Sequence, residues 1–151
     1  MFRGVSAINM DAKGRMAMPA KYRDRLQECC NNRLVLTVDL DRCLLLFPEP
    51  DWEQFERKLM QLPTLNTRTR RLQRLFLGHA SECEVDNQGR ILLPQLLREY
   101  AGLDKHVVLV GQGAKFELWD ENSWNENREA WLTEEAQSTD ALPAELETLS
   151  F

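Results

Sequence analysis

Long hydrophobic runs are missing from this sequence, and glycine and proline are sparse, with 7 and 6 among 151 residues. No apolar run reaches the roughly 20 residues that cross a bilayer, so we expect no membrane span. Residues 1–6 lack the apolar stretch of a signal peptide, so we expect a cytoplasmic protein. Hydrophobic residues make up 43% and charged residues 28%. That is a globular composition, which excludes collagen-like, low-complexity and wholly disordered chains.

Metal ligands and catalytic motifs are also scarce. The four cysteines form no C-x-x-C pair, so we expect reduced, structural thiols. The only metal-like spacing is His79-x-x-x-Cys83 with His106 as a distant third ligand, whereas structural zinc sites use four close ligands. The sequence contains no G-x-S-x-G, no P-loop and no H-E-x-x-H. We therefore expect neither an enzyme nor a metal or other cofactor.

Charge is divided unevenly along the chain, which has a net charge of −5. Residues 120–151 hold nine acidic residues and one basic residue, so the first 119 residues carry a net charge of +3. Residues 1–33 alone carry +4. The acidic tail is either a solvated helical surface or a segment that repels nucleic acid and directs it to the basic front.

An internal repeat is the strongest pattern. Residues 11–19 (DAKGRMAMP) recur as residues 86–94 (DNQGRILLP), with Asp, Gly, Arg and Pro at matching positions. The match continues through Tyr22-Arg23-Asp24 and Leu97-Arg98-Glu99 at the same spacing of 75 residues. We interpret this pattern as a duplicated supersecondary unit.

Each copy of the repeat predicts a strand, a turn, a second strand, a short helix and a hairpin. In the first copy these elements are expected at residues 5–10, 11–14, 15–18, 21–27, and 34–38 with 43–47. One unit of about 45 residues is too small to bury a stable core alone. We therefore predict an α+β fold in which the two copies interleave their hairpins into one pseudo-symmetric β-barrel, with flanking helices.

Helical patterning follows each copy. Asp51 is expected to cap a first helix, and Asn66 or Thr67 to begin a second. The second helix carries Arg68, Arg70, Arg71 and Arg74, which either contact phosphates or pair with acidic residues of the tail or of a neighbouring subunit.

Further helical segments are expected after the second copy, the last opening at Thr139-Asp140. The predicted domains are a first repeat (1–48), a helical linker (49–76), a second repeat (77–120) and acidic C-terminal helices (121–151).

The repeated D-x-x-G-R-x-x-x-P motif, its duplication and the opening residues MFRG resemble the bacterial MraZ family. Its two units are AbrB/SpoVT-like swapped-hairpin modules. Residues 77–83 (LGHASEC) and 110–119 (VGQGAKFELW) also look like stretches of this family. The resemblance implies a nucleoid-associated, sequence-specific transcriptional regulator of the division and cell-wall gene cluster, including its own promoter. It also implies a ring-shaped homo-oligomer, and we expect a repressor that binds tandem repeats in double-stranded promoter DNA.

The first repeated motif offers two cations on a narrow hairpin. Lys13 is expected at the tip and Arg15 at the base, where Arg15 can read guanine O6 and N7. Gly14 falls where a positive φ is expected. Asp11 is expected to accept backbone N–H bonds or to orient Arg15. From the motif alone, a purely structural clasp between Asp11 and Arg15 is an equal alternative, and the resemblance favours DNA contact.

The second motif has the same plan but a less favourable local charge, because Gln88 replaces Lys13. Asp86 and Gly89 are expected to keep the structural roles of their counterparts. Arg90 is expected to contact DNA less than Arg15, or to act chiefly within the fold. Arg3 is a further candidate for a phosphate contact.

The main rival function is an antitoxin-like protein-binding module that uses the acidic tail. Such a tail would be an extended, disordered wrapper, whereas Trp124, Trp131, Leu142 and Leu146 indicate docked helices.

Overall fold

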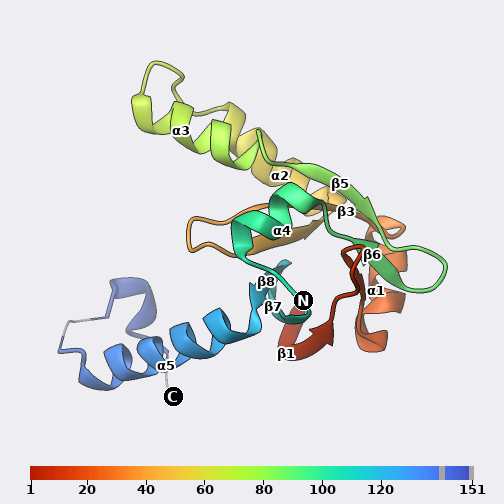
Figure 1. The fold of residues 1–151 in the computed structure, drawn as a ribbon. Helices are drawn as coiled ribbons and strands as arrows, with labels where there is room; N and C mark the ends of the chain where they lie inside the picture. Colours follow the sequence, from red (N-terminus) through yellow and green to blue (C-terminus); the bar gives the residue numbers. More distant parts are fainter. Residues whose placement is uncertain (140–141, 150–151) are drawn as a thin grey trace. The chain divides into compact units, whose positions relative to one another are not determined.

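The computed structural model describes residues 1–139 and 142–149, and the chain divides into two compact units, residues 1–121 and 122–151 (Figure 1). The first repeat contains β1 (Phe2–Asn9), β2 (Arg15–Ala17), α1 (Ala20–Cys30), β3 (Arg33–Val38) and β4 (Leu44–Pro48). The second contains β5 (Ser81–Glu84), β6 (Arg90–Leu92), α4 (Gln95–Ala101), β7 (His106–Gly113) and β8 (Lys115–Asp120). The shared element order agrees with the predicted duplication.

Helices join and follow the two repeats. α2 (Glu49–Met60) and α3 (Thr67–Phe76) connect them, and α5 (Glu121–Gln137) and a short 3-10 helix (Ala144–Leu146) come after β8. Within the described ranges, no helix has the length and apolar character needed to span a membrane.

The strands of the two repeats interleave. A six-stranded antiparallel sheet has the order β1-β7-β8-β4-β3-β5, and β2 pairs with β6 in a separate two-stranded ribbon. The counterparts in the two repeats are β1 and β5, β3 and β7, and β4 and β8. Exchanging them gives the same strand order read from the other end of the sheet, so the two repeats are related by a pseudo-twofold axis. The fold is α+β, as predicted. Among the described residues β1 and β5 are the edge strands of the sheet, so the predicted barrel is not confirmed.

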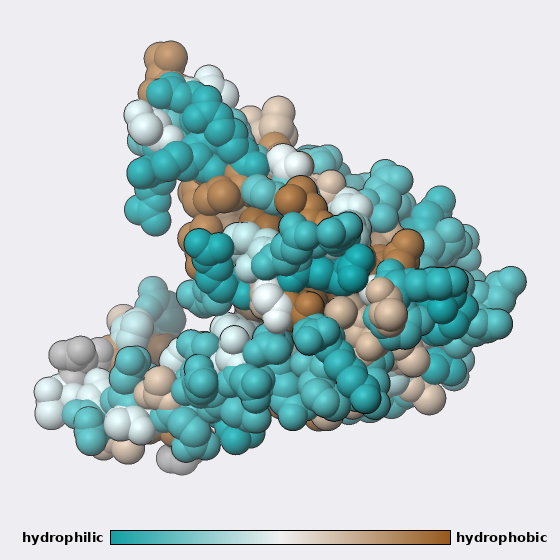
Figure 2. Space-filling view, viewed as in Figure 1, coloured by the Kyte–Doolittle hydropathy of each residue, from teal (hydrophilic) through white to brown (hydrophobic). Residues whose placement is uncertain are grey.

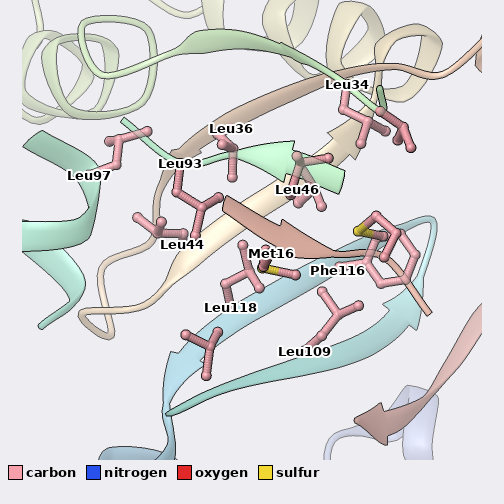
Figure 3. Packing of buried hydrophobic residues seen from close by; sticks show 14 of the residues in the cluster. Met16, Leu34, Leu36, Leu44, Leu46, Leu93, Leu97, Leu109, Phe116 and Leu118 are labelled. Atoms are coloured by element: carbon pink, nitrogen blue, oxygen red, sulfur yellow. The ribbon is translucent and has the colours of Figure 1, made fainter. Parts of the chain in front are cut away.

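The main core lies between the sheet and the ribbon. Met16 of β2 shares one buried cluster with Leu44 and Leu46 of β4 and with Leu109 and Leu118 of the second repeat (Figure 3). These side chains are at most 1% exposed, so neither repeat could bury this core without the other.

On the opposite face of the sheet, α2 and α3 cover the part formed by β3 and β4. Side chains alternate along a strand, so Leu34 and Leu36 face the main core while Val35 faces a second cluster. That cluster contains Trp52 of α2, with Phe76 of α3 packed against it. The ribbon and the α2–α3 pair therefore lie on opposite faces of the sheet.

One helix start and one helix length differ from the sequence-based expectation, and one helix start agrees. α2 begins at Glu49, so Asp51 lies in its first turn and is not its cap, because Pro48 already supplies an N-terminal conformation. α1 runs for 11 residues and is longer than expected. Asn66 caps α3 as predicted, its side chain accepting the backbone N–H of Arg68 at 2.8 Å. The expected helix start at Asp140 lies outside the described residues.

Candidate nucleic-acid interface

The first motif forms a tight turn held by one carboxylate. Asp11 Oδ1 accepts the backbone N–H groups of Lys13 at 3.0 Å and Arg15 at 2.9 Å. Asp11 Oδ2 accepts Arg15 Nε at 2.8 Å. Gly14 has a φ of +88°, as predicted for this position. Asp11 therefore does both things expected of it, holding the turn and orienting the arginine.

The second motif repeats this geometry. Asp86 Oδ1 accepts the backbone N–H groups of Gln88 and Arg90, both at 2.9 Å. Asp86 Oδ2 lies 3.4 Å from Arg90 Nε, and Gly89 has a φ of +77°. The clasp uses only Nε and leaves 34% of the Arg15 side chain and 33% of the Arg90 side chain exposed. Each guanidinium is thus oriented and still accessible to a ligand.

The two arginines emerge on one face of the β2–β6 ribbon. Met16 and Ile91 point into the core, so the residues on either side of them point outward. Arg15 lies opposite Leu92, and Arg90 lies opposite Ala17. The outer face of the ribbon therefore presents a guanidinium at each end, and the turns that carry Lys13 and Gln88 extend from its two ends.

Two further arginines belong to this surface, and neither was among the residues singled out for it from the sequence. Arg23 Nε donates to the carbonyl of Met18 at 2.9 Å, and Arg98 Nε donates to that of Leu93 at 3.0 Å. A Cβ on Gly89 would lie 2.6 Å from Arg23 Cζ. Each turn is thus covered by a guanidinium from the other repeat.

Interleaving brings these arginines to the turns. The backbone N–H of Met18 donates to Gly89 O, and that of Leu93 donates to Gly14 O, both at 2.8 Å. The match of Arg23 with Arg98 at the repeat spacing was visible in the sequence, but their neighbours across repeats were not. Arg23 places a positive charge beside the second turn, where the sequence alone showed only Gln88.

The remaining candidate cations lie elsewhere. Lys13 is exposed at the tip of its turn, as expected. Arg3 is exposed on β1 opposite Gln112, about 25 Å along the strand from Asp11 at roughly 3.3 Å per residue. Arg68, Arg70, Arg71 and Arg74 are exposed on α3. The structure therefore does not bring Arg3 or the α3 arginines onto the ribbon.

Hydrogen bonds within each turn lower the pKa of its aspartate. The backbone N–H of Arg15 is the largest influence lowering the pKa of Asp11, and its guanidinium adds to it. The backbone N–H of Arg90 does the same for the pKa of Asp86. Because the pKa is lowered in the folded protein, the ionised carboxylate stabilises the turn fully at pH values above 3.8, the ordinary pKa of aspartate. This stabilisation is lost as the pH falls through the lowered pKa.

We expect an NMR titration of the full chain to place the pKa of Asp11 and Asp86 below 3.8. In Arg15→Ala the Asp11 pKa should rise only part of the way back, because the backbone donors of residues 13 and 15 remain. A pKa of Asp11 at or above its ordinary value in the wild-type protein would mean that these hydrogen bonds do not persist in solution.

One group of potential metal ligands lies away from the ribbon. Asp39, Cys43 and Glu117 place their ligand atoms within 4.8 Å of one another, the only such group among the described residues. Burial and the nearby carboxylates raise the pKa of the Cys43 thiol, and burial raises that of Glu117. Cys43 Sγ donates a hydrogen bond to Asp39 Oδ2. These surroundings favour the protonated thiol of Cys43, whereas a metal binds the thiolate. His79 and His106 instead contact Leu75 O and Asn9 Oδ1.

Comparison with known proteins agrees with the repeat structure. The sequence model of one family, described as "MraZ protein, putative antitoxin-like", matches residues 1–75 and again residues 76–143. The chain is 61% identical over 150 residues to a protein of Thioalkalivibrio sulfidiphilus named Transcriptional regulator MraZ, with 99% of each chain covered. Proteins with the same name from Halorhodospira halophila and Methylococcus capsulatus are each 55% identical, with 99% and 100% of both chains covered.

Proposed function

The chain belongs to the MraZ family, and on that premise we propose that it is a sequence-specific DNA-binding transcriptional regulator that reads DNA through the β2–β6 ribbon. We propose that it represses the division and cell-wall gene cluster, including its own promoter, as a nucleoid-associated ring of identical subunits. Its repeats, 1–48 and 77–120, act together as one reading head, with 49–76 and 121–151 outside it.

The outer face of the ribbon is the observation that carries this proposal. The major groove, about 12 Å wide, admits a two-stranded β-ribbon. Arg15 and Arg90 point from one face of this ribbon, each oriented by a carboxylate, and a guanidinium can donate two hydrogen bonds to one guanine. Lys13, Arg23 and Arg98 lie at the flanking turns, where phosphate contacts position the protein.

The acidity of the whole chain does not oppose this function. In each turn the carboxylate is paired with its arginine, so Asp11 and Asp86 present little free negative charge to DNA. Eight of the acidic residues belong to residues 121–151, outside the proposed reading head. The charge that a duplex would meet is the local charge of the ribbon and its turns.

A tail-dependent antitoxin is the rival function. An antitoxin tail is expected to be extended before it meets its partner, whereas residues 121–137 form a helix of 17 residues. The helical form supports the regulator over the antitoxin. Trp131, Leu142 and Leu146 are nevertheless exposed, so the docking expected of these side chains is not observed.

The test is binding to DNA from upstream of the protein's own gene, carrying either one repeat or several. One ribbon makes few contacts, so a ring should bind several repeats about 10² to 10⁴ times more tightly than one. Affinity should also fall steeply with salt, because phosphate contacts release counterions. Equal affinity for both fragments would contradict the multivalent ring. Absence of salt-sensitive, sequence-dependent binding to either would contradict DNA recognition.

A further inference from the structure

The exposed face of α3 is a cluster of four arginines, Arg68, Arg70, Arg71 and Arg74, here called the α3 arginines. Within the described part of the chain, none of them pairs with a carboxylate, although Arg70 donates to two backbone carbonyls of the preceding loop. Leu65 in that loop is 92% exposed. Figure 2 shows hydrophilic side chains along this helix, with a hydrophobic group at its loop end.

The α3 arginines lie on the opposite face of the sheet from the β2–β6 ribbon. α3 is held to the sheet where the Thr37 hydroxyl donates to Phe76 O at 2.6 Å, on the same face as Val35. The ribbon covers the other face, where Leu34 and Leu36 meet Met16. The sheet therefore lies between a duplex bound on the ribbon and the α3 arginines, which leaves these arginines available to another partner.

A surface of complementary character lies at the other end of the same chain. Every residue from 128 to 139 is exposed, and Glu129, Glu134 and Glu135 stand among them. Leu132, at 58% exposed, adds an apolar side chain with Glu129 and Glu135 three residues away on either side. Residues 120–151 as a whole carry a net charge of −8. The acidic side chains around Leu132 on α5 are thus complementary to the basic side chains on α3, which follow the exposed Leu65 of the preceding loop.

We infer that the α3 arginines bind the acidic α5 segment of a second copy of this chain. The two surfaces differ, so the contact is head-to-tail, and such contacts generate rings when the rotation closes. Complementary charge would set the partner and the register, and the exposed leucines would supply apolar contact. This inference rests on the proposed homo-oligomer and identifies the surfaces that join its subunits.

Charge exchange between the two surfaces tests the inference. Arg71→Glu with Arg74→Glu should weaken self-association of the full chain about tenfold or more, measured by sedimentation velocity across protein concentrations. Glu134→Arg with Glu135→Arg should do the same. Mixing the two variants should restore the wild-type assembly, because each reversed surface then meets its complement. Circular dichroism confirms that each variant folds.

Single substitutions provide a matched control. Arg71→Glu alone should also weaken self-association. Lys115→Glu, in the β7–β8 hairpin, changes the net charge by the same amount but should leave the assembly intact. Binding to a one-repeat DNA fragment should be unchanged in the α3 variants, because the ribbon is untouched.

Each other result overturns the inference in a recognisable way. Weaker one-repeat binding with an intact oligomer would make α3 a DNA-binding surface. An oligomer that survives both reversals, or variants that do not assemble when mixed, would place the subunit contact elsewhere and leave the ring itself standing. A wild-type protein that stays monomeric would remove the ring and this inference together, while DNA recognition would still be judged by the ribbon.

Discussion

Arg15→Ala is expected to lose most of the binding to promoter DNA while the protein stays folded and assembled. A good bidentate contact to guanine is worth about 1 to 3 kcal/mol, so one-repeat binding should fall by about 5-fold to 150-fold. The loss should be larger on several repeats, because each ribbon of a ring contributes. The turn itself should survive, because the backbone N–H groups of Lys13 and Arg15 still donate to Asp11.

Comparison with other arginines makes this result specific. Arg57→Ala removes the same charge from α2, on the face of the sheet opposite the ribbon, and should bind as wild type does. Arg90→Ala should cost less than Arg15→Ala, because Gln88 and not a lysine accompanies it. Fluorescence anisotropy at several salt concentrations measures all three. If Arg15→Ala bound as tightly as wild type, Arg15 would serve only the clasp with Asp11.

Gly111→Ala is expected to have the largest effect on stability. Gly111 pairs with Gly4 where β7 meets β1, and a Cβ there would lie 2.5 Å from the backbone N of Arg3 and 2.7 Å from its Cα. The obstacle is backbone, which cannot rotate away, so β1 must move off the sheet. We expect a loss of about 2 to 4 kcal/mol in the free energy of unfolding, from urea denaturation at fixed protein concentration.

Gly102→Ala is the control for this substitution. Gly102 ends α4 with a φ of +62°, and a Cβ there would meet nothing within 4 Å. Only the backbone strain remains, so the loss should be about 1 kcal/mol. A loss for Gly111→Ala no greater than that for Gly102→Ala would mean that β1 and β7 do not approach this closely in solution.

Local features of this protein could be predicted from its sequence because each depends on residues close together in the chain. The turn at residues 11–14 follows from an aspartate that can reach two amides ahead of it and a glycine that tolerates positive φ. Asn66 was predicted as a cap for the same reason. The duplication could be recognised in the sequence because both copies keep these local requirements. The repeated motif also carried the resemblance to the MraZ family.

What only the tertiary structure decided is how the two copies meet. At both ends of the sheet a strand of one repeat pairs with a strand of the other, and the ladders of the described residues do not close into a barrel. Periodicity could not reveal this, because it reports which face of a strand is apolar and not which strand lies beside it. The positions of Arg23 and Arg98 over the turns of the opposite repeat depend on that interleaving. The separation of the ribbon from the α3 arginines by the sheet also depends on tertiary structure. The packing of the core, and not the order of segments along the chain, decides which distant segments lie close together.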